Sequence, residues 1–347
     1  MAVAPRPRCG RVATTLLVIV AAMLSSCMSR SEDFGDWESR FYWGAHVAVE
    51  SPGGDYSAAV QRLESATGTS MSAARTYRRW EDPFPTATEV SLKSGQRLDV
   101  MSIKPIRADG SRIAWAEIGR ATAGTQLYGE MTTWARRIKK FGRPIYVTLH
   151  HEPETTDDKA SGDSADYIKA WKRFAEIIRE SGGPNVRLMW IMTDRSFTLT
   201  NDDWQFAGNW YPGDDVVDAI GVDAFNWYTC RGRNEGWKSA RELIEPARLF
   251  AASHPTTEFW VTELGSIEDP SDPGRRAAWL AELATLPRSA GWDQLHGVLY
   301  FNDVHGPQFP ACDWRLSNGP AAAAFGRLDA IPAEPPTTVT STSPTTT

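Results

Sequence analysis

The stretch Pro144-Ile-Tyr-Val-Thr-Leu-His-His-Glu152 decides the fold class of this chain, together with a second run, Glu258-Phe-Trp-Val-Thr-Glu263. Both runs are short, rich in apolar and β-branched residues, and end in a glutamate. Such runs predict buried β-strands. In a barrel of parallel strands all the strand C-termini lie on one face, so two carboxylates that are far apart in the sequence can meet across a single cleft.

Strand-like runs alternate with helix-like runs between residues 40 and 331, which is the pattern of parallel β/α units. Eight strands are expected, and eight is the number that closes a (β/α)8 barrel. We therefore predict an α/β fold with a single (β/α)8 TIM-barrel domain over residues 40–331. The predicted strands are 41–49, 72–77, 97–103, 144–150, 186–192, 216–223, 258–262 and 297–301.

The helix after the fourth strand has the clearest signals. Asp163 or Ser164 is expected as its N-cap, apolar residues such as Ile168 and Ile178 repeat on one face, and Gly182 ends it. Helices after the second and fifth strands are weakly marked. Similar patterns predict helices over 125–140, 239–252 and 274–286.

Alternation along the fourth strand predicts which side chains face the barrel interior. Ile145, Val147 and Leu149 fall on the face toward the helices. The interior face then carries Tyr146, Thr148, His150 and Glu152. The same rule would place Glu263 on the helix-facing side of the seventh strand, so we expect a β-bulge or a twist near the end of that strand.

The composition is that of an ordinary soluble globular protein, with 347 residues of which 41% are hydrophobic and 23% charged. The net charge of -6 argues against a nucleic-acid partner, because such proteins usually present a basic face to the phosphates. A neutral polysaccharide makes no such demand. The 15 Trp are many, and their flat faces suit both sugar stacking and core packing.

The two ends of the chain differ in composition from the rest. Residues 1–26 have the form of an export signal, with three arginines before an apolar run that is shorter than the roughly 20 residues that span a bilayer. Leu-Ser-Ser-Cys27 resembles the bacterial lipoprotein processing box, although an ordinary signal peptide with a chance cysteine is the alternative. We expect lipidation of Cys27, a tether over 27–39, and a Pro/Thr/Ser-rich disordered tail over 332–347.

From these ends we expect an exported protein that is anchored to the outer side of the bacterial cell membrane, or secreted. Membrane contact is expected through the N-terminal lipid only, and the protein is expected to be a monomer.

Two carboxylates across one cleft are what cleavage of a glycosidic bond requires. One carboxyl group protonates the departing oxygen, while the other attacks, or activates water against, the developing oxocarbenium ion. Glu152 and Glu263 are the candidate pair.

Three sequence features, in this order along the chain, resemble glycoside hydrolase family 26, within the clan A retaining (β/α)8 glycosidases. They are His151-Glu152 after the fourth strand, Asn209-Trp-Tyr-Pro-Gly-Asp-Asp215 followed by Val217-Asp-Ala-Ile-Gly-Val-Asp223, and Thr262-Glu263 after the seventh. The resemblance implies that Glu152 is the general acid and base and Glu263 the nucleophile, with His151 positioning the acid or binding sugar. It also implies endo-acting cleavage, with retention, of a β-linked polysaccharide, β-mannan first and β-1,3-xylan or mixed-linkage glucan as variants.

The chain departs from the clan at one position. Clan members commonly carry a tyrosine after the sixth strand, in a Gly-x-Asp-x-Tyr arrangement, that hydrogen-bonds the nucleophile, and here Phe225 stands in that slot. Tyr228 and Tyr300 are the candidates to replace it.

Positions at the strand ends give further candidates for sugar contact. The expected stacking platforms are Trp115, Trp190, Trp227 and Tyr228, and the expected polar contacts are Asp223, Tyr300, Asn302 and Asp303. Cys230 follows the sixth strand and Cys312 the eighth. In an exported protein they suggest a disulfide that holds two loops at the same barrel face, with two free thiols as the alternative.

Two other function classes are open. A lipoprotein could bind glycans in the same cleft without cleaving them, which Phe225 favours and the presence of both glutamates opposes. A metal-dependent hydrolase is suggested by His150, His151 and Glu152, but adjacent residues on an extended strand point to opposite faces and make poor joint ligands. We therefore expect no metal and no cofactor.

Overall fold

The computed structural model describes residues 37, 40–49 and 54–331. The predicted export signal over 1–26, the lipid site Cys27, most of the tether and the tail over 332–347 lie outside the described residues. Among the helices of the described ranges, none combines the length and the apolar character that a membrane crossing needs.

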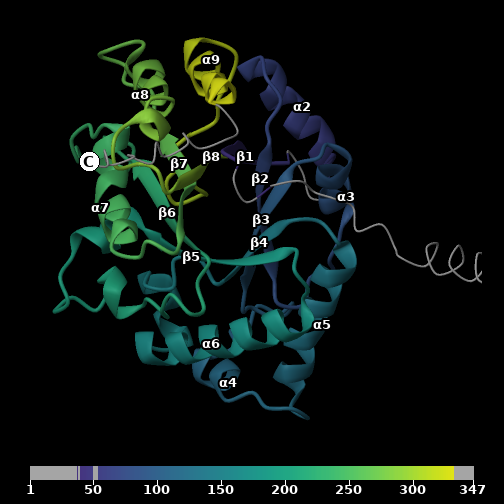
Figure 1. Ribbon diagram of the computed structural model, residues 1–347. Coiled ribbons are helices and arrows are strands. Elements are labelled where there is room, and N and C mark those ends of the chain that lie inside the picture. Colours follow the sequence, from purple (N-terminus) through teal and green to yellow (C-terminus); the bar gives the residue numbers. More distant parts are fainter. Residues whose placement is uncertain (1–36, 38–39, 50–53, 332–347) are drawn as a thin grey trace, which may run out of the picture. The chain divides into compact units, whose positions relative to one another are not determined.

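Eight parallel strands close into a barrel, in which each strand pairs with the next and β8 pairs with β1 (Figure 1). The predicted fold class and the predicted number of strands are confirmed. The strands are β1 Tyr42–Val47, β2 Ala73–Arg79, β3 Leu98–Lys104, β4 Ile145–Leu149, β5 Val186–Thr193, β6 Ala219–Asn226, β7 Glu258–Ser266 and β8 Leu295–Asn302.

The bounds of β6 and β7 differ most from the prediction. β6 begins at Ala219 rather than at residue 216. Asp218, just before it, is bound to Leu188 on β5: the Asp218 N–H donates to the Leu188 carbonyl, and the Asp218 carboxylate accepts from the Leu188 N–H. β7 continues to Ser266, so that Glu263 lies within the strand and not after its end.

Helices cover the outside of the barrel (Figure 1). The predicted cap Asp163 is confirmed, since its side chain accepts a backbone N–H in the first turn of the helix that follows, and Thr125 and Ser239 cap two further helices in the same way. The helices are α2 Tyr56–Thr67, α3 Ala87–Ser94, α4 Trp115–Gly119, α5 Gln126–Phe141, α6 Ser164–Ser181, α7 Ala240–Ala252, α8 Arg275–Leu283 and α9 Pro320–Gly326.

The regions with weak helix signals are short or irregular. α3 has 8 residues, and the connection from β5 to β6 holds two 3-10 turns, Asp194–Thr198 and Ala207–Asn209. α8 ends at Leu283, before the predicted residue 286, because Pro287 follows in a separate 3-10 turn.

Inside the barrel, apolar and polar side chains are separated along the strand direction. The apolar interior layer consists of Tyr42, Ala73, Leu98, Val100, Tyr146, Met189, Ile191, Ala219, Trp260 and Leu299. Further along the same strands, Arg75 and Tyr77 follow Ala73, Asp223 follows Ala219, and Glu263 follows Trp260. The polar residues therefore gather toward the C-terminal ends of the strands.

The indole ring of Trp260 fills the space above Gly297, so that a Cβ atom at residue 297 would lie 2.2 Å from Cζ3 of that ring. We expect Gly297→Ala to lower the free energy of unfolding by about 1–3 kcal/mol, because the buried ring has to move. Gly129→Ala is the matched control: Gly129 is exposed in α5, nothing lies within 4 Å of the added atom, and a gain of about 0.5–1 kcal/mol is expected. Urea denaturation measures both, and equal stability of Gly297→Ala and the unsubstituted protein would contradict the packing described.

Candidate active site

A β-bulge in β7 brings Glu263 to the barrel mouth. Val261 pairs with Val222 on β6, but the next pair is Glu263 with Asp223, so Thr262 is the extra residue and the register shifts. The predicted irregularity near the end of the seventh strand is confirmed. Its consequence is that Asp223 and Glu263 stand side by side on neighbouring strands, both buried.

The chain leaves β4 through a turn that aims Glu152 into the site. His150 and Glu152 have φ angles of 56° and 52°, a left-handed conformation that is uncommon for residues other than glycine. Two backbone hydrogen bonds hold the turn, from the His150 N–H to the Ile103 carbonyl on β3 and from the Glu152 N–H to the Ile191 carbonyl on β5. Strain of this kind persists where surrounding contacts enforce it, often at functional sites.

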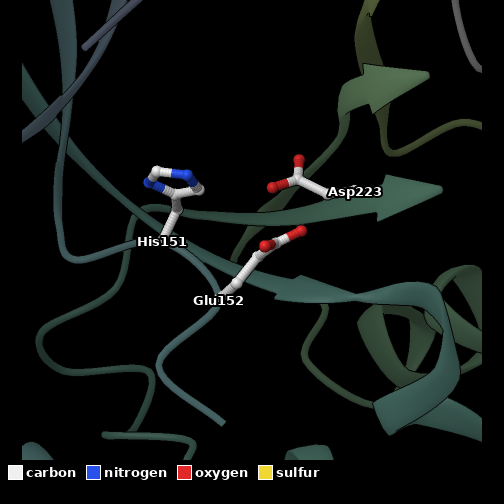
Figure 2. Close-up of side chains that lie close together, drawn as sticks. All are labelled: His151, Glu152 and Asp223. Atoms are coloured by element: carbon white, nitrogen blue, oxygen red, sulfur yellow. The ribbon is translucent and has the colours of Figure 1, made fainter. Parts of the chain in front are cut away.

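The same turn removes His150 from the interior face, and the prediction that it shares a face with Glu152 is wrong. His150 is fully buried: its Nδ1 accepts a hydrogen bond from the Trp115 indole at 3.1 Å, and its Nε2 lies 3.0 Å from Oδ2 of Asp158. His151 and Glu152 instead point together toward Asp223, as Figure 2 shows.

His151, Glu152 and Asp223 form a compact cluster. One ligand atom from each lies within 4.8 Å of the others, so this trio is where the described part of the chain could hold a metal ion. Asp223 accepts a hydrogen bond from Thr262 at 2.6 Å through Oδ1, whereas its Oδ2 has no hydrogen-bond partner among the described residues.

The electrostatics of the cluster favour neutral forms. Burial, with the charges of Asp223 and Glu263, raises the pKa of Glu152 well above its ordinary value. Burial and the guanidinium of Arg75 hold the pKa of His151 well below its ordinary value, so the imidazole is uncharged near neutral pH. A carboxyl group that keeps its proton near neutral pH is suited to act as a general acid.

Glu263 has different surroundings, in which three side chains approach a single oxygen and one of them donates a hydrogen bond to it. The Tyr77 hydroxyl on β2 donates to Oε1 at 2.7 Å, Nη2 of Arg75 lies 3.6 Å from Oε1, and Nε2 of His151 lies 3.9 Å from it. The tyrosine bound to Glu263 is thus Tyr77, and the prediction that Tyr228 or Tyr300 takes this place is wrong.

Three residues predicted to contact sugar are fully buried elsewhere, and the prediction is wrong for them. Trp115 packs between Tyr167 and Trp210 and holds His150. Trp190 packs on the outer side of the barrel against Tyr211 and Phe250. The Tyr300 hydroxyl donates to the Trp314 carbonyl and receives a hydrogen bond from Arg276.

The other predicted contact residues are partly exposed, at the end of β8 and on the loops after β6 and β8. They are Trp227, Tyr228, Asn302 and Asp303. Asp303 lies 3.6 Å from His46, and the Asn302 side chain accepts a hydrogen bond from the Leu316 N–H. Cys230 and Cys312 are joined in a disulfide, the pairing expected from the sequence, so the two loops are covalently linked.

Arg75, Tyr77 and His46 were missed by the sequence analysis. Arg75 and Tyr77 lie on a strand that was predicted, and they alternate with Thr76. The signal that could have identified them is the charge of Arg75 on the strand face that otherwise carries apolar residues.

Residues 125–258 match the sequence model of Glycosyl hydrolase family 26. Endoglucanase H of Acetivibrio thermocellus is 26% identical over 338 residues, which are 91% of this chain and 33% of the relative. The beta-1,3-xylanase TXYA of a Vibrio species is 27% identical over 160 residues, 45% of this chain and 33% of the relative. The chain thus spans about a third of the length of these curated relatives.

Two solved structures show the same fold at low sequence identity. The catalytic domain of a Bacillus sp. JAMB-750 family 26 endo-beta-1,4-mannanase has a TM-score of 0.60 at 11% identity and covers 87% of this chain and 90% of its own. A beta-mannanase of Bacteroides ovatus has a TM-score of 0.55 at 14% identity, covering 86% and 90%.

The predicted resemblance to family 26 is confirmed, and the matches support a glycosidase. The matched segment contains Glu152 but stops before Glu263.

The charge of Asp223 is one cause of the raised pKa of Glu152, and Asp223→Asn removes it. We expect the pKa of Glu152 to fall, because ionisation no longer places two negative charges side by side, while burial keeps it above the ordinary value. NMR titration of ¹³C-labelled glutamate side chains measures the change. Asp303→Asn is the control, since Asp303 pairs with His46 and is not among the groups that shift Glu152; an unchanged Glu152 titration in Asp223→Asn would contradict the coupling.

Proposed function

We propose that the chain is a retaining glycoside hydrolase that cleaves a β-linked polysaccharide internally. The proposal depends on one observation: Glu152 is half-buried beside other carboxyl groups that raise its pKa, whereas Glu263 accepts a hydrogen bond from Tyr77 and lies beside Arg75. Two carboxyl groups in such unequal surroundings suit the two roles that glycosidic cleavage needs.

The reaction proceeds in two displacements. A carboxylate oxygen of Glu263 forms a bond to the anomeric carbon while the bond to the leaving oxygen breaks, and that oxygen takes both the bonding electrons and the proton of Glu152. Water then attacks the same carbon, Glu152 takes a proton from the water, and Glu263 leaves as a carboxylate. The sum is hydrolysis with retained configuration, and Glu152 and Glu263 return to their starting states.

The finer proposal for the substrate is β-mannan, with β-1,3-xylan and β-glucan as the other candidates. The support is that solved structures of similar fold are described as mannanases, and that curated relatives are named an endoglucanase and beta-1,3-xylanases. Reducing ends released from these three polysaccharides identify the substrate. If the protein binds any of the three polysaccharides but releases reducing ends from none of them, the non-catalytic glycan-binding alternative is favoured.

The two glutamates are expected to respond differently to substitution. Glu263→Ala abolishes turnover of every substrate, because no nucleophile remains. Glu152→Ala abolishes turnover of natural glycosides but retains the first step on aryl glycosides, whose leaving group needs no proton. Comparing kcat/KM on a polysaccharide and on a dinitrophenyl glycoside tests this, and equal losses of Glu152→Ala on both would contradict the division of roles.

We also propose, from the sequence, that the protein is exported and lipidated at Cys27 and acts on glycans outside the cell membrane. Cys27→Ser is expected to abolish incorporation of radiolabelled palmitate and to move the protein from the membrane fraction to the soluble fraction. Cys9→Ser is the control, because Cys9 precedes the apolar run. Palmitate incorporation that survives Cys27→Ser would contradict the proposal.

A further inference from the structure

We propose that Tyr77 on β2 is the positioning residue for Glu263, and that Oε2 of Glu263 is the oxygen that attacks the anomeric carbon. The inference rests on the proposed function and deepens it. It assigns a role to a strand that carries neither glutamate, and it distinguishes the two oxygens of the nucleophile.

The contacts of Glu263 are unequal between its two oxygens. Oε1 is the atom contacted by the Tyr77 hydroxyl, by Arg75 and by His151, at 2.7, 3.6 and 3.9 Å. Oε1 accepts the Tyr77 hydrogen bond and faces the Arg75 guanidinium, so it is poorly placed to attack. Oε2, which receives none of these three contacts, is left for the substrate.

Tyr77 is itself held in place on several sides. The Arg75 guanidinium lies 4.6 Å from the centre of the Tyr77 ring, and the rings of His46 and His151 lie 5.0 and 5.4 Å from it. Arg75 is fully buried and donates to the Val100 carbonyl at 3.2 Å and to Ser102 at 2.8 Å. The hydroxyl therefore has little freedom to leave Glu263.

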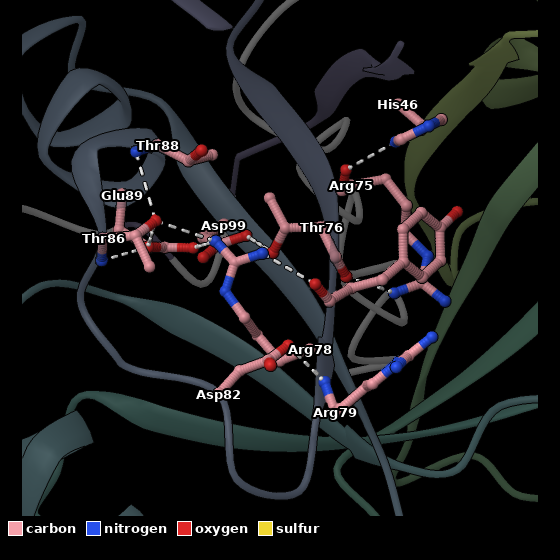
Figure 3. Close-up of polar contacts among 11 residues, drawn as sticks. His46, Arg75, Thr76, Arg78, Arg79, Asp82, Thr86, Thr88, Glu89 and Asp99 are labelled. Atoms are coloured by element: carbon pink, nitrogen blue, oxygen red, sulfur yellow. Dashed lines mark hydrogen bonds and ion pairs between the residues drawn. The ribbon is translucent and has the colours of Figure 1, made fainter. Parts of the chain in front are cut away.

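The outer face of β2 is anchored as well. Figure 3 shows the groups on both faces of this strand, with Thr76 donating to Asp99 at 2.7 Å and Arg78 paired with Glu89 at the start of α3. Glu89 and Asp99 are buried, so these bonds are shielded from water. β2 is thus a rigid support for Tyr77.

The hydroxyl acts as a donor throughout. Burial, together with the negative charge of Glu263, raises the pKa of Tyr77 well above its ordinary value, so the phenol keeps its proton near neutral pH. Its hydrogen bond orients the carboxylate before attack and stabilises the negative charge when Glu263 departs in the second displacement.

Phe225 explains why this donor comes from β2. Its ring packs against Trp314, Trp227 and Phe301 at centroid distances of 5.2, 5.5 and 5.8 Å. It also lies over Gly265, where an added Cβ would be 2.9 Å from the Phe225 ring. β6 therefore presents an apolar ring beside β7, and the hydroxyl is supplied from the other side of the site.

Tyr77→Phe tests the role, because it removes one hydroxyl and keeps the ring. On an aryl glycoside we expect kcat to fall about 10- to 100-fold, the size of one hydrogen bond to a charged group. KM is expected to fall with kcat, because the second displacement loses the donor and the glycosyl-enzyme accumulates. Mass spectrometry at steady state should then detect the covalent adduct.

Tyr146→Phe is the matched control. Tyr146 is also a buried barrel tyrosine that donates to a carboxylate, Glu258, but it lies at the opposite end of the interior. We expect it to lower stability and to leave kcat and KM unchanged. Thermal unfolding of both variants verifies that each is folded before its kinetics are compared.

A second measurement needs no variant. A crystal structure of the unsubstituted protein labelled by a 2-deoxy-2-fluoro glycoside should show the ester through Oε2, with Oε1 still facing Tyr77. An ester through Oε1, or Tyr77→Phe kinetics equal to those of the unsubstituted protein, would overturn this inference alone. Absence of both hydrolysis and labelling in the unsubstituted protein would instead overturn the proposed function.

Discussion

The ion pair between the buried guanidinium of Arg75 and Glu263 is the interaction on which the polar cluster at the barrel mouth depends. Burial of several carboxyl groups in one place is costly unless a cation and hydrogen-bond donors compensate their charge. Arg75 supplies the cation, because it is fully buried, is fixed by β3 and lies 3.6 Å from Glu263, and the Tyr77 hydroxyl supplies a donor. The polar cluster therefore exists only when β2 and β3 are already packed against each other, and the chemistry of the site is tied to the closure of the sheet.

The turn after β4 shows how the backbone creates what strand geometry alone does not. Regular alternation would direct His151 and Glu152 to opposite faces. Left-handed conformations at His150 and Glu152, each held by a hydrogen bond to a neighbouring strand, direct both side chains into the site instead. Hydrogen bonds to carbonyl groups of β3 and β5 compensate the energetic cost of these conformations.

Much of the fold could be predicted from the sequence, because its signals are local. The alternation in β4, the cap Asp163 and the misfit of Glu263 that required a bulge all depend on residues close in the chain. The site was predicted less well. The position of Trp115 and Trp190 along the chain is compatible with either the site or the core. Only tertiary packing decides that both are buried. Tyr77 was missed because its partner, Glu263, is contributed by β7, and no local pattern links the two strands.

The groups of the proposed site come from β2, β6 and β7 and from the turn after β4, and the barrel closes through the pairing of β1 with β8. While the chain emerges from the ribosome, both glutamates are made before residues 295–302 exist, yet nothing holds them at working separation. The proposed site can therefore be complete only after β8 has paired with β1. A half-barrel of this sequence would hold only part of the proposed site.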